Sequence, residues 1–162
     1  MNAITYKEIF PLIKENKMWL GISTNGSNRW FRVPNNYIHR NNAAGYKEQD
    51  GKKYLFVNGI MWFTNMDHSK RHEKIDLYKH YSPEEYPKYD NYDAIEVSKV
   101  CEIPMDYDGV IGVPITFLNK YCPEQFKIIG IANSARWIGD FPCFTIIKGK
   151  KIYNRILIKR IG

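Results

Sequence analysis

The residues of this sequence best suited to chemistry lie in three short stretches that combine cations with hydrogen-bonding or stacking groups. The first stretch contains Ser27, Asn28, Arg29, Trp30 and Arg32. Two guanidinium groups beside an indole can bind phosphate and stack on a displaced base, so these residues are candidate DNA contacts. The alternative is the start of a half-buried strand, with Trp30 in the core and both arginines in solvent. The residue types alone leave both interpretations open.

The second stretch is a run of charged and imidazole side chains: Asp67, His68, Lys70, Arg71 and His72. His68 and His72 are four residues apart and can share a helix face to bind zinc, but a third and a fourth ligand are not evident. A basic turn that faces phosphate fits this set better, and a solvated helix end fits it equally well. We therefore treat His68, Lys70, Arg71 and His72 as candidate DNA contacts and predict no metal site.

The third stretch contains Asn133, Ser134 and Arg136. Asn can read an adenine edge and Arg a guanine edge, each with two hydrogen bonds. The same residues also suit a loop whose Asn and Ser bond their own backbone. Further cations follow near the C-terminus, where we expect one solvated, positively charged strand face. They are Lys148, Lys150, Lys151, Arg155, Lys159 and Arg160.

The bulk composition favours one domain with a polyanionic partner. The chain has 162 residues, 44% of them hydrophobic, a net charge of +7 and a pI near 9.2. A basic balance favours nucleic acid, because neutralised phosphates release counterions. Three scattered cysteines without a Cys-x-x-Cys pair fit a reducing cytoplasm. The sequence has no targeting segment and no apolar run of membrane-spanning length, so we expect a cytoplasmic protein without a membrane partner.

Hydrophobic patterning predicts one helix and several strands. The helix is expected over residues 6–15, bent by Pro11, with a short strand over residues 18–22 after it. Residues 35–49 are polar and indicate a loop. Asn58-Gly59 predicts a hairpin between residues 53–57 and 60–64, and a single long strand with a bulge at Gly59 is the competing prediction.

The C-terminal half has the more informative apolar runs. Strands are expected over residues 94–100 and 126–131, and in the run 110–118, which Pro114 confines to an edge strand or to brief pairing. Gly109 and Gly112 allow the backbone to bend or to approach a neighbour closely. A hairpin is expected between residues 144–147 and 152–158, across Lys148-Gly149-Lys150-Lys151.

Three segments, taken together and in order, resemble EcoRI-type adenine-specific DNA methyltransferases. They are Asn2-Ala3-Ile4-Thr5-Tyr6-Lys7-Glu8-Ile9-Phe10-Pro11-Leu12-Ile13-Lys14, Trp62-Phe63-Thr64-Asn65-Met66-Asp67-His68, and the run from Tyr86-Pro87-Lys88-Tyr89-Asp90-Asn91-Tyr92-Asp93-Ala94-Ile95-Glu96-Val97 to Phe126. They span most of the chain. The resemblance implies double-stranded DNA as partner and S-adenosylmethionine as methyl donor of the complete enzyme.

The chain lacks two elements that the resemblance leads us to expect. Such enzymes bind the donor at a Gly-containing strand-to-helix turn and clamp a flipped adenine with an Asn/Asp-Pro-Pro-Phe/Tyr element. The sequence has no Pro-Pro pair, and Gly109-x-x-Gly112 precedes a β run. In the family both elements lie N-terminal to the segment that matches residues 2–14. We therefore expect a C-terminal portion without catalytic residues or a cofactor of its own, inactive alone and paired with an N-terminal methyltransferase half.

The expected fold is mixed α/β in one domain. The resemblance implies that residues 1–66 form the end of a Rossmann-like methyltransferase sheet with its antiparallel hairpin, and that residues 94–162 form a β-rich target-recognition part. The expected function is DNA recognition within an adenine-specific (N6) methyltransferase of a restriction-modification system. A stand-alone DNA-binding module and an inactive truncated fragment are the alternatives.

Overall fold

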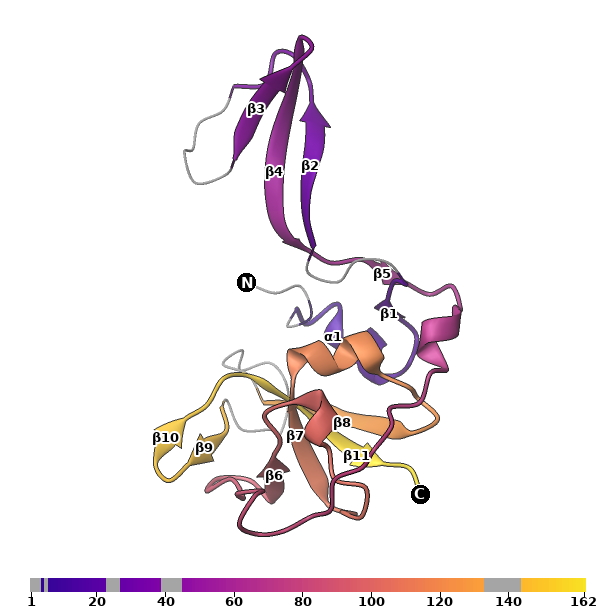
Figure 1. Ribbon diagram of the computed structural model, residues 1–162, viewed down its shortest axis with the longest axis vertical. Coiled ribbons are helices and arrows are strands. Elements are labelled where there is room, and N and C mark those ends of the chain that lie inside the picture. Colours follow the sequence, from indigo (N-terminus) through magenta and orange to yellow (C-terminus); the bar gives the residue numbers. More distant parts are fainter. Residues whose placement is uncertain (1–3, 5, 23–26, 39–44, 133–143) are drawn as a thin grey trace. The chain divides into compact units, whose positions relative to one another are not determined.

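The computed structural model describes residues 4, 6–22, 27–38, 45–132 and 144–162, which are mostly β-strand with few helices (Figure 1). This agrees with the prediction of a β-rich chain with one clear helix. The chain forms two compact units: unit 1 comprises Met1–Trp19 with Thr64–Gly162, and unit 2 comprises Leu20–Phe63. The functional division expected at residues 1–66 and 94–162 stays a prediction.

Unit 2 contains a three-stranded antiparallel sheet in the order β2-β4-β3. Its strands are β2 (Ser27–Val33), β3 (Tyr46–Gln49) and β4 (Lys52–Ile60). Asp50 and Gly51 join β3 to β4 with φ angles of 52° and 66°. Two successive positive φ values define the mirror-image turn that matches strand twist in a two-residue hairpin. The loop predicted over residues 35–49 is therefore wrong in its last four residues.

The hairpin predicted at Asn58-Gly59 is wrong, because β4 continues through both residues to Ile60. The competing prediction of a bulged strand is confirmed. Arg29 pairs with Val57, whereas Ser27 pairs with Ile60, so β4 carries one more residue than β2 across this interval. The pairing of β4 with β2 continues to Ile60, and this ladder outweighs the local turn preference of Asn-Gly.

Unit 1 contains a mixed four-stranded sheet in the order β6-β7-β11-β8. The strands are β6 (Ala94–Glu96), β7 (Val110–Pro114), β8 (Phe126–Ala132) and β11 (Arg155–Arg160). β6 pairs with β7 in parallel, and the other pairs are antiparallel. The predicted run 126–131 is confirmed as a strand. The run 110–118 is a strand only as far as Pro114, since the 3-10 helix η4 (Ile115–Lys120) follows. Because β7 lies between β6 and β11, the edge-strand alternative is wrong, and the run is paired only over the five residues up to Pro114.

Both faces of this sheet are buried in unit 1. Leu157 is fully buried on one face, and the largest apolar group lies on the other. Ile111, Ile156 and Ile158 are fully buried there, and α1 and η4 contact β8 and β11 respectively. α1 is shorter than predicted: the α-helix covers Phe10–Lys14, preceded by hydrogen-bonded turns. Pro11 lies in its first turn, where no N–H partner is needed, so the proline begins the helix and does not bend it.

Smaller elements complete the fold. They are β1 (Trp19–Leu20), β5 (Phe63–Thr64), β9 (Ile146–Ile147), β10 (Lys150–Lys151), and the 3-10 helices η2 (Ser69–Arg71) and η3 (Val100–Glu102). β1 pairs with β5, and β9 pairs with β10 across Lys148-Gly149, whose φ angles of 49° and 73° repeat the turn of the β3–β4 hairpin. The predicted hairpin is present, but its turn consists of Lys148 and Gly149 alone, because Lys150 and Lys151 belong to β10. Residues 155–158 pair with β7 and β8, not with residues 144–147.

A buried ionic cluster links three strands of unit 1. The Arg155 Nε donates to the Glu96 carboxylate at 2.9 and 3.0 Å, and Arg155 Nη2 donates to it at 2.6 Å. Tyr89 Oη donates to the same carboxylate. Gly112 of β7 lies between Glu96 and Leu157 in register, and a Cβ there would come within 2.7 Å of the Tyr89 ring. The predicted close approach at Gly112 is therefore confirmed, and Tyr89 occupies the space.

Candidate nucleic-acid interface

Strand alternation divides the first candidate stretch between the two faces of the unit 2 sheet. Directly paired residues of antiparallel strands share a face. Trp30 and Arg32 of β2 therefore lie with their β4 partners Phe56 and Tyr54, and Lys47 of β3 also pairs with Tyr54. We call this side the cationic face. It comprises Trp30, Arg32, Lys47, Gln49, Lys52, Tyr54 and Phe56.

Aromatic rings hold one lysine in place on the cationic face. The Trp30 and Phe56 rings lie 5.0 Å apart, and the Lys47 ammonium lies 4.8 Å from the Trp30 ring and 5.4 Å from the Tyr54 ring. Lys47 Nζ also donates to Gln49 Oε1 at 3.3 Å. Trp30 is 43% exposed, so its side chain does not lie in the core as the alternative interpretation proposed. None of these contacts of Lys47 is with a carboxylate.

The opposite face has a different character. Arg29, Phe31 and Val57 are exposed there. Lys53 lies 3.9 Å from the Glu48 carboxylate and donates to the Tyr37 carbonyl at 3.4 Å. The structure thus brings Trp30 and Arg32 together and separates Arg29 from them. Ser27 and Asn28 lie in β2, and their side chains are outside the described part of the chain.

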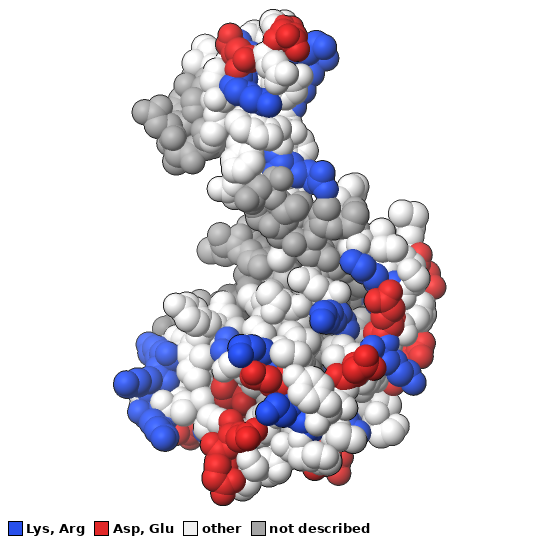
Figure 2. Space-filling view, in the orientation of Figure 1, with Lys and Arg blue, Asp and Glu red and all other residues white. Residues whose placement is uncertain are grey.

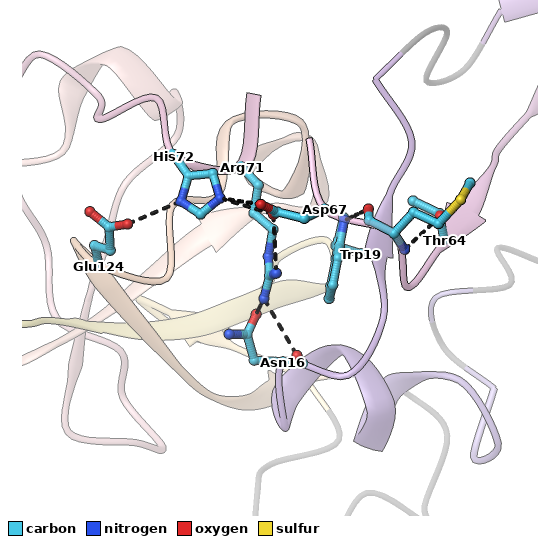
Figure 3. A network of polar contacts seen from close by, with 8 residues as sticks. Asn16, Trp19, Thr64, Asp67, Arg71, His72 and Glu124 are labelled. Atoms are coloured by element: carbon cyan, nitrogen blue, oxygen red, sulfur yellow. Dashed lines mark hydrogen bonds and ion pairs between the residues drawn. The ribbon is translucent and has the colours of Figure 1, made fainter. Parts of the chain in front are cut away.

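The second candidate stretch forms a polar network within unit 1, in which Arg71 has structural partners (Figure 3). The Arg71 guanidinium stacks 3.3 Å from the Trp19 ring centroid and donates to the side chain and the carbonyl of Asn16. It also lies 3.6 Å from the Asp67 carboxylate, and only 12% of the side chain is exposed. These contacts connect η2 to the end of α1 and to β1.

His72 lies between two carboxylates in the same network. Its Nδ1 lies 3.0 Å from Glu124 and its Nε2 lies 2.9 Å from Asp67, as Figure 3 shows. Hydrogen bonding to Glu124, and then to Asp67, raises the pKa of His72 above its ordinary value. The hydrogen bond to His72 is in turn the largest cause that lowers the pKa of Asp67. The charges of His72 and Asp67 therefore compensate each other within the protein.

The other members of this stretch do not complete a metal site. Lys70 is exposed and His68 is half-buried. In the described part of the chain, no group of three or more His, Cys, Asp and Glu side chains is arranged to hold a metal ion. Within the same residues, no helix is long and apolar enough to cross a lipid bilayer.

The third stretch, with Asn133, Ser134 and Arg136, lies outside the described residues. The C-terminal cations do not form one solvated face as expected. Arg155 is buried with Glu96, because the start of β11 faces the interior of unit 1. Lys150, Lys151 and Lys159 are exposed.

The described residues do not fit a bound S-adenosylmethionine. Gly109-x-x-Gly112 leads into β7 and not into a helix, and the space over both glycines is filled by the rings of Tyr107 and Tyr89. One cavity of about 250 Å³ is lined by charged side chains such as Lys70, Glu73 and Asp76, and no glycine is among its lining residues.

Sequence reasoning missed five members of the cationic face: Lys47, Gln49, Lys52, Tyr54 and Phe56. The Asp50-Gly51 pair was the available signal, because Asp-Gly favours the two-residue hairpin turn that brings β3 beside β4. Once that turn is placed, alternation puts Lys47 and Lys52 on the side of Trp30.

Comparison with known proteins agrees with the resemblance found in the sequence. The chain is 45% identical over 161 residues to Type II methyltransferase M.EcoRI of Escherichia coli, which covers 98% of this chain and 48% of that protein. It is 36% identical over 172 residues to Type II methyltransferase M.MpnI of Mycoplasma pneumoniae, covering 98% and 54%. The chain thus spans about half the length of these relatives, and no solved structure matches it. The family model described as adenine-specific methyltransferase EcoRI matches residues 1–161. The chain therefore belongs to the EcoRI family of adenine-specific methyltransferases.

Proposed function

We propose that this chain is the C-terminal, DNA-recognising portion of an adenine-specific (N6) DNA methyltransferase of a restriction-modification system. The observation that carries the proposal is the match of nearly the whole chain to about half of two type II methyltransferases. A second polypeptide segment supplies the S-adenosylmethionine loop and the Asn-Pro-Pro-Phe element. The tyrosine rings over Gly109 and Gly112 support this division of labour, since they leave no cradle for the donor there.

The fold of the complete enzyme is part of the proposal. In it, this chain completes a Rossmann-like sheet that begins in the other segment. The mostly β-strand structure of the described residues, with one mixed sheet, is consistent with a part of such a domain. The assignment of residues 1–66 to that sheet and of residues 94–162 to recognition remains a prediction.

The contribution to DNA recognition is electrostatic in the first place. A protein with a net charge of +7 attracts the phosphate backbone, and each neutralised phosphate releases counterions. Phosphate contacts fix the register of a protein on the duplex, whereas contacts to base edges select the sequence. On this proposal the chain positions the duplex, and the other segment carries out methyl transfer.

A titration of the 162-residue chain with duplex DNA over a salt series tests the recognition role. We expect log K to fall linearly with log salt, with a slope of about −0.9 for each phosphate contacted. An absence of binding at low salt would leave the inactive fragment as the explanation. Methylation measured after co-expression with a donor-binding segment of the same family separates the half-enzyme from a stand-alone DNA-binding module, which gains no activity.

A further inference from the structure

The positive charge of the molecule is concentrated in unit 2. This unit has six Lys and Arg residues against Glu48 and Asp50, which gives a net charge of +4 of the total +7. The cations are Arg29, Arg32, Arg40, Lys47, Lys52 and Lys53. Unit 1 is more than twice as long and carries the remaining +3, and on the side in view in Figure 2 its Lys and Arg side chains are interspersed with Asp and Glu.

The two faces of the unit 2 sheet use their cations differently. On the cationic face, Arg32, Lys47 and Lys52 share a side with Trp30 and Tyr54, and no carboxylate belongs to that set. Within the described residues, none of these three cations takes part in an ion pair. On the opposite face Lys53 pairs with Glu48.

We infer that the cationic face binds the sugar-phosphate backbone of duplex DNA, with Arg32, Lys47 and Lys52 as its phosphate contacts. The inference rests on the proposed function and adds to it the element and the face that meet DNA. The major groove of DNA is wide enough for a two-stranded antiparallel β-ribbon, and some proteins bind DNA through β-sheets. An antiparallel sheet such as that of unit 2 can therefore lie along the DNA backbone. The opposite face has one exposed cation, Arg29, beside the exposed apolar side chains of Phe31 and Val57. Its Lys53 is compensated by Glu48, so this face has weaker complementarity to phosphate.

The aromatic residues of the cationic face prepare it for binding. Long lysine side chains lose rotamer freedom when they become fixed on a partner. Lys47 already lies over the Trp30 and Tyr54 rings, so part of that ordering is complete before DNA arrives. A cation held by rings remains free to exchange onto a phosphate, whereas a cation paired with a carboxylate must first lose that partner.

Neighbouring lysines on opposite faces provide the test. Lys52 and Lys53 are consecutive in β4, so Lys52→Gln and Lys53→Gln remove the same charge from the same strand on different sides. Lys47→Gln adds a second member of the cationic face. Each variant of the full chain is titrated with duplex DNA over a salt series, after circular dichroism and thermal melting show that it is folded.

We expect Lys47→Gln and Lys52→Gln each to lower the salt slope by about 0.9 and to weaken binding, while Lys53→Gln leaves the slope unchanged. Equal losses from Lys52→Gln and Lys53→Gln, or unchanged slopes in both variants of the cationic face, would overturn the inference and leave the proposed function in place. If the wild-type chain itself fails to bind DNA at low salt, the proposed function fails and the inference falls with it.

Discussion

At the scale of single residues, the contacts of Arg71 and His72 in the second candidate stretch favour a role in stabilising the fold over a role in DNA contact. Arg71 stacks on Trp19 and is mostly buried, and His72 bridges Asp67 and Glu124. A cation already compensated by carboxylates gains less from a phosphate, because it must exchange one anion for another. The network therefore connects η2 to neighbouring segments of unit 1.

The His72 bridge predicts a pH dependence of stability. Its pKa is raised above the ordinary 6.5, so the charged imidazole stabilises the folded state fully below that value. This stabilisation is lost as the pH rises through the folded pKa. We expect the wild-type melting temperature to fall as the pH rises from about 6.5 into the alkaline range, and His72→Gln to flatten that fall. Thermal melts monitored by circular dichroism across this range measure the effect.

Glu124→Gln serves as the partner control for the same experiment, since Glu124 is the largest cause of the raised pKa. Its pH dependence should lie between those of the wild type and of His72→Gln. A wild-type slope that persists in His72→Gln would assign the titration to another group. On the acidic side Asp67 acts in the reverse sense, because its lowered pKa makes its contribution disappear only at low pH.

At the scale of elements, one buried ion pair ties the parallel part of the unit 1 sheet to its antiparallel part. Glu96 belongs to β6 and Arg155 to β11, with β7 between them. The carboxylate can reach across because Gly112 of β7 has no side chain, and Tyr89 closes the space above it. Burial, followed by the hydrogen bond to Glu96, raises the pKa of Tyr89, so its phenol stays protonated and continues to donate.

Breaking this ion pair should destabilise the whole unit. Arg155→Met leaves the Glu96 charge buried without its cation, which costs about 3–5 kcal/mol. We expect a decrease of about 10 °C in the melting temperature. Lys159→Met, on the exposed part of the same strand, is the matched control, and its effect should stay within about 0.5 kcal/mol. Similar melting temperatures for the two variants would show that the cluster contributes little.

The sequence predicted local features of this fold better than long-range ones. The strand over residues 126–131, the close approach at Gly112 and the turn at Lys148-Gly149 follow from short patterns, and all three are present. The Asn58-Gly59 hairpin failed because β4 stays paired with β2 through these residues to Ile60. The prediction that Arg155 is solvated was wrong. Its partner Glu96 lies 59 residues away in the sequence, and local patterns give no information about contacts at that separation.

The candidate site follows the same rule. The choice of Trp30 and Arg32 as a pair could be made from composition, but their separation from Arg29 required the strand register. Lys47 joins them through a turn of two residues and a pairing between three strands. Alternation along a strand is simple to apply once the partners are known, and the partners of β2 and β3 are not specified by their own residues.

At the scale of the whole molecule, the unit with most of the positive charge is not the unit with the glycines that could suit a loop for the methyl donor. The cations concentrate in unit 2, whereas the glycines that would suit a donor loop lie in unit 1 under tyrosine rings. Because the relatives are about twice as long as this chain, the family supplies room for a donor-binding segment outside it. Under the proposed function, the chain depends on that segment for activity.

This dependence predicts that the 162-residue chain alone does not bind S-adenosylmethionine. A donor loop needs backbone N–H groups at a strand-to-helix turn, and α1, the α-helix of the described residues, spans five residues from Phe10 and has Pro11 in its first turn. Isothermal titration calorimetry should give no saturable heat for the chain, and a saturable heat for the chain mixed with a donor-binding segment of the family. Saturable binding by the chain alone would contradict the half-enzyme proposal, since the donor site would then lie within these residues.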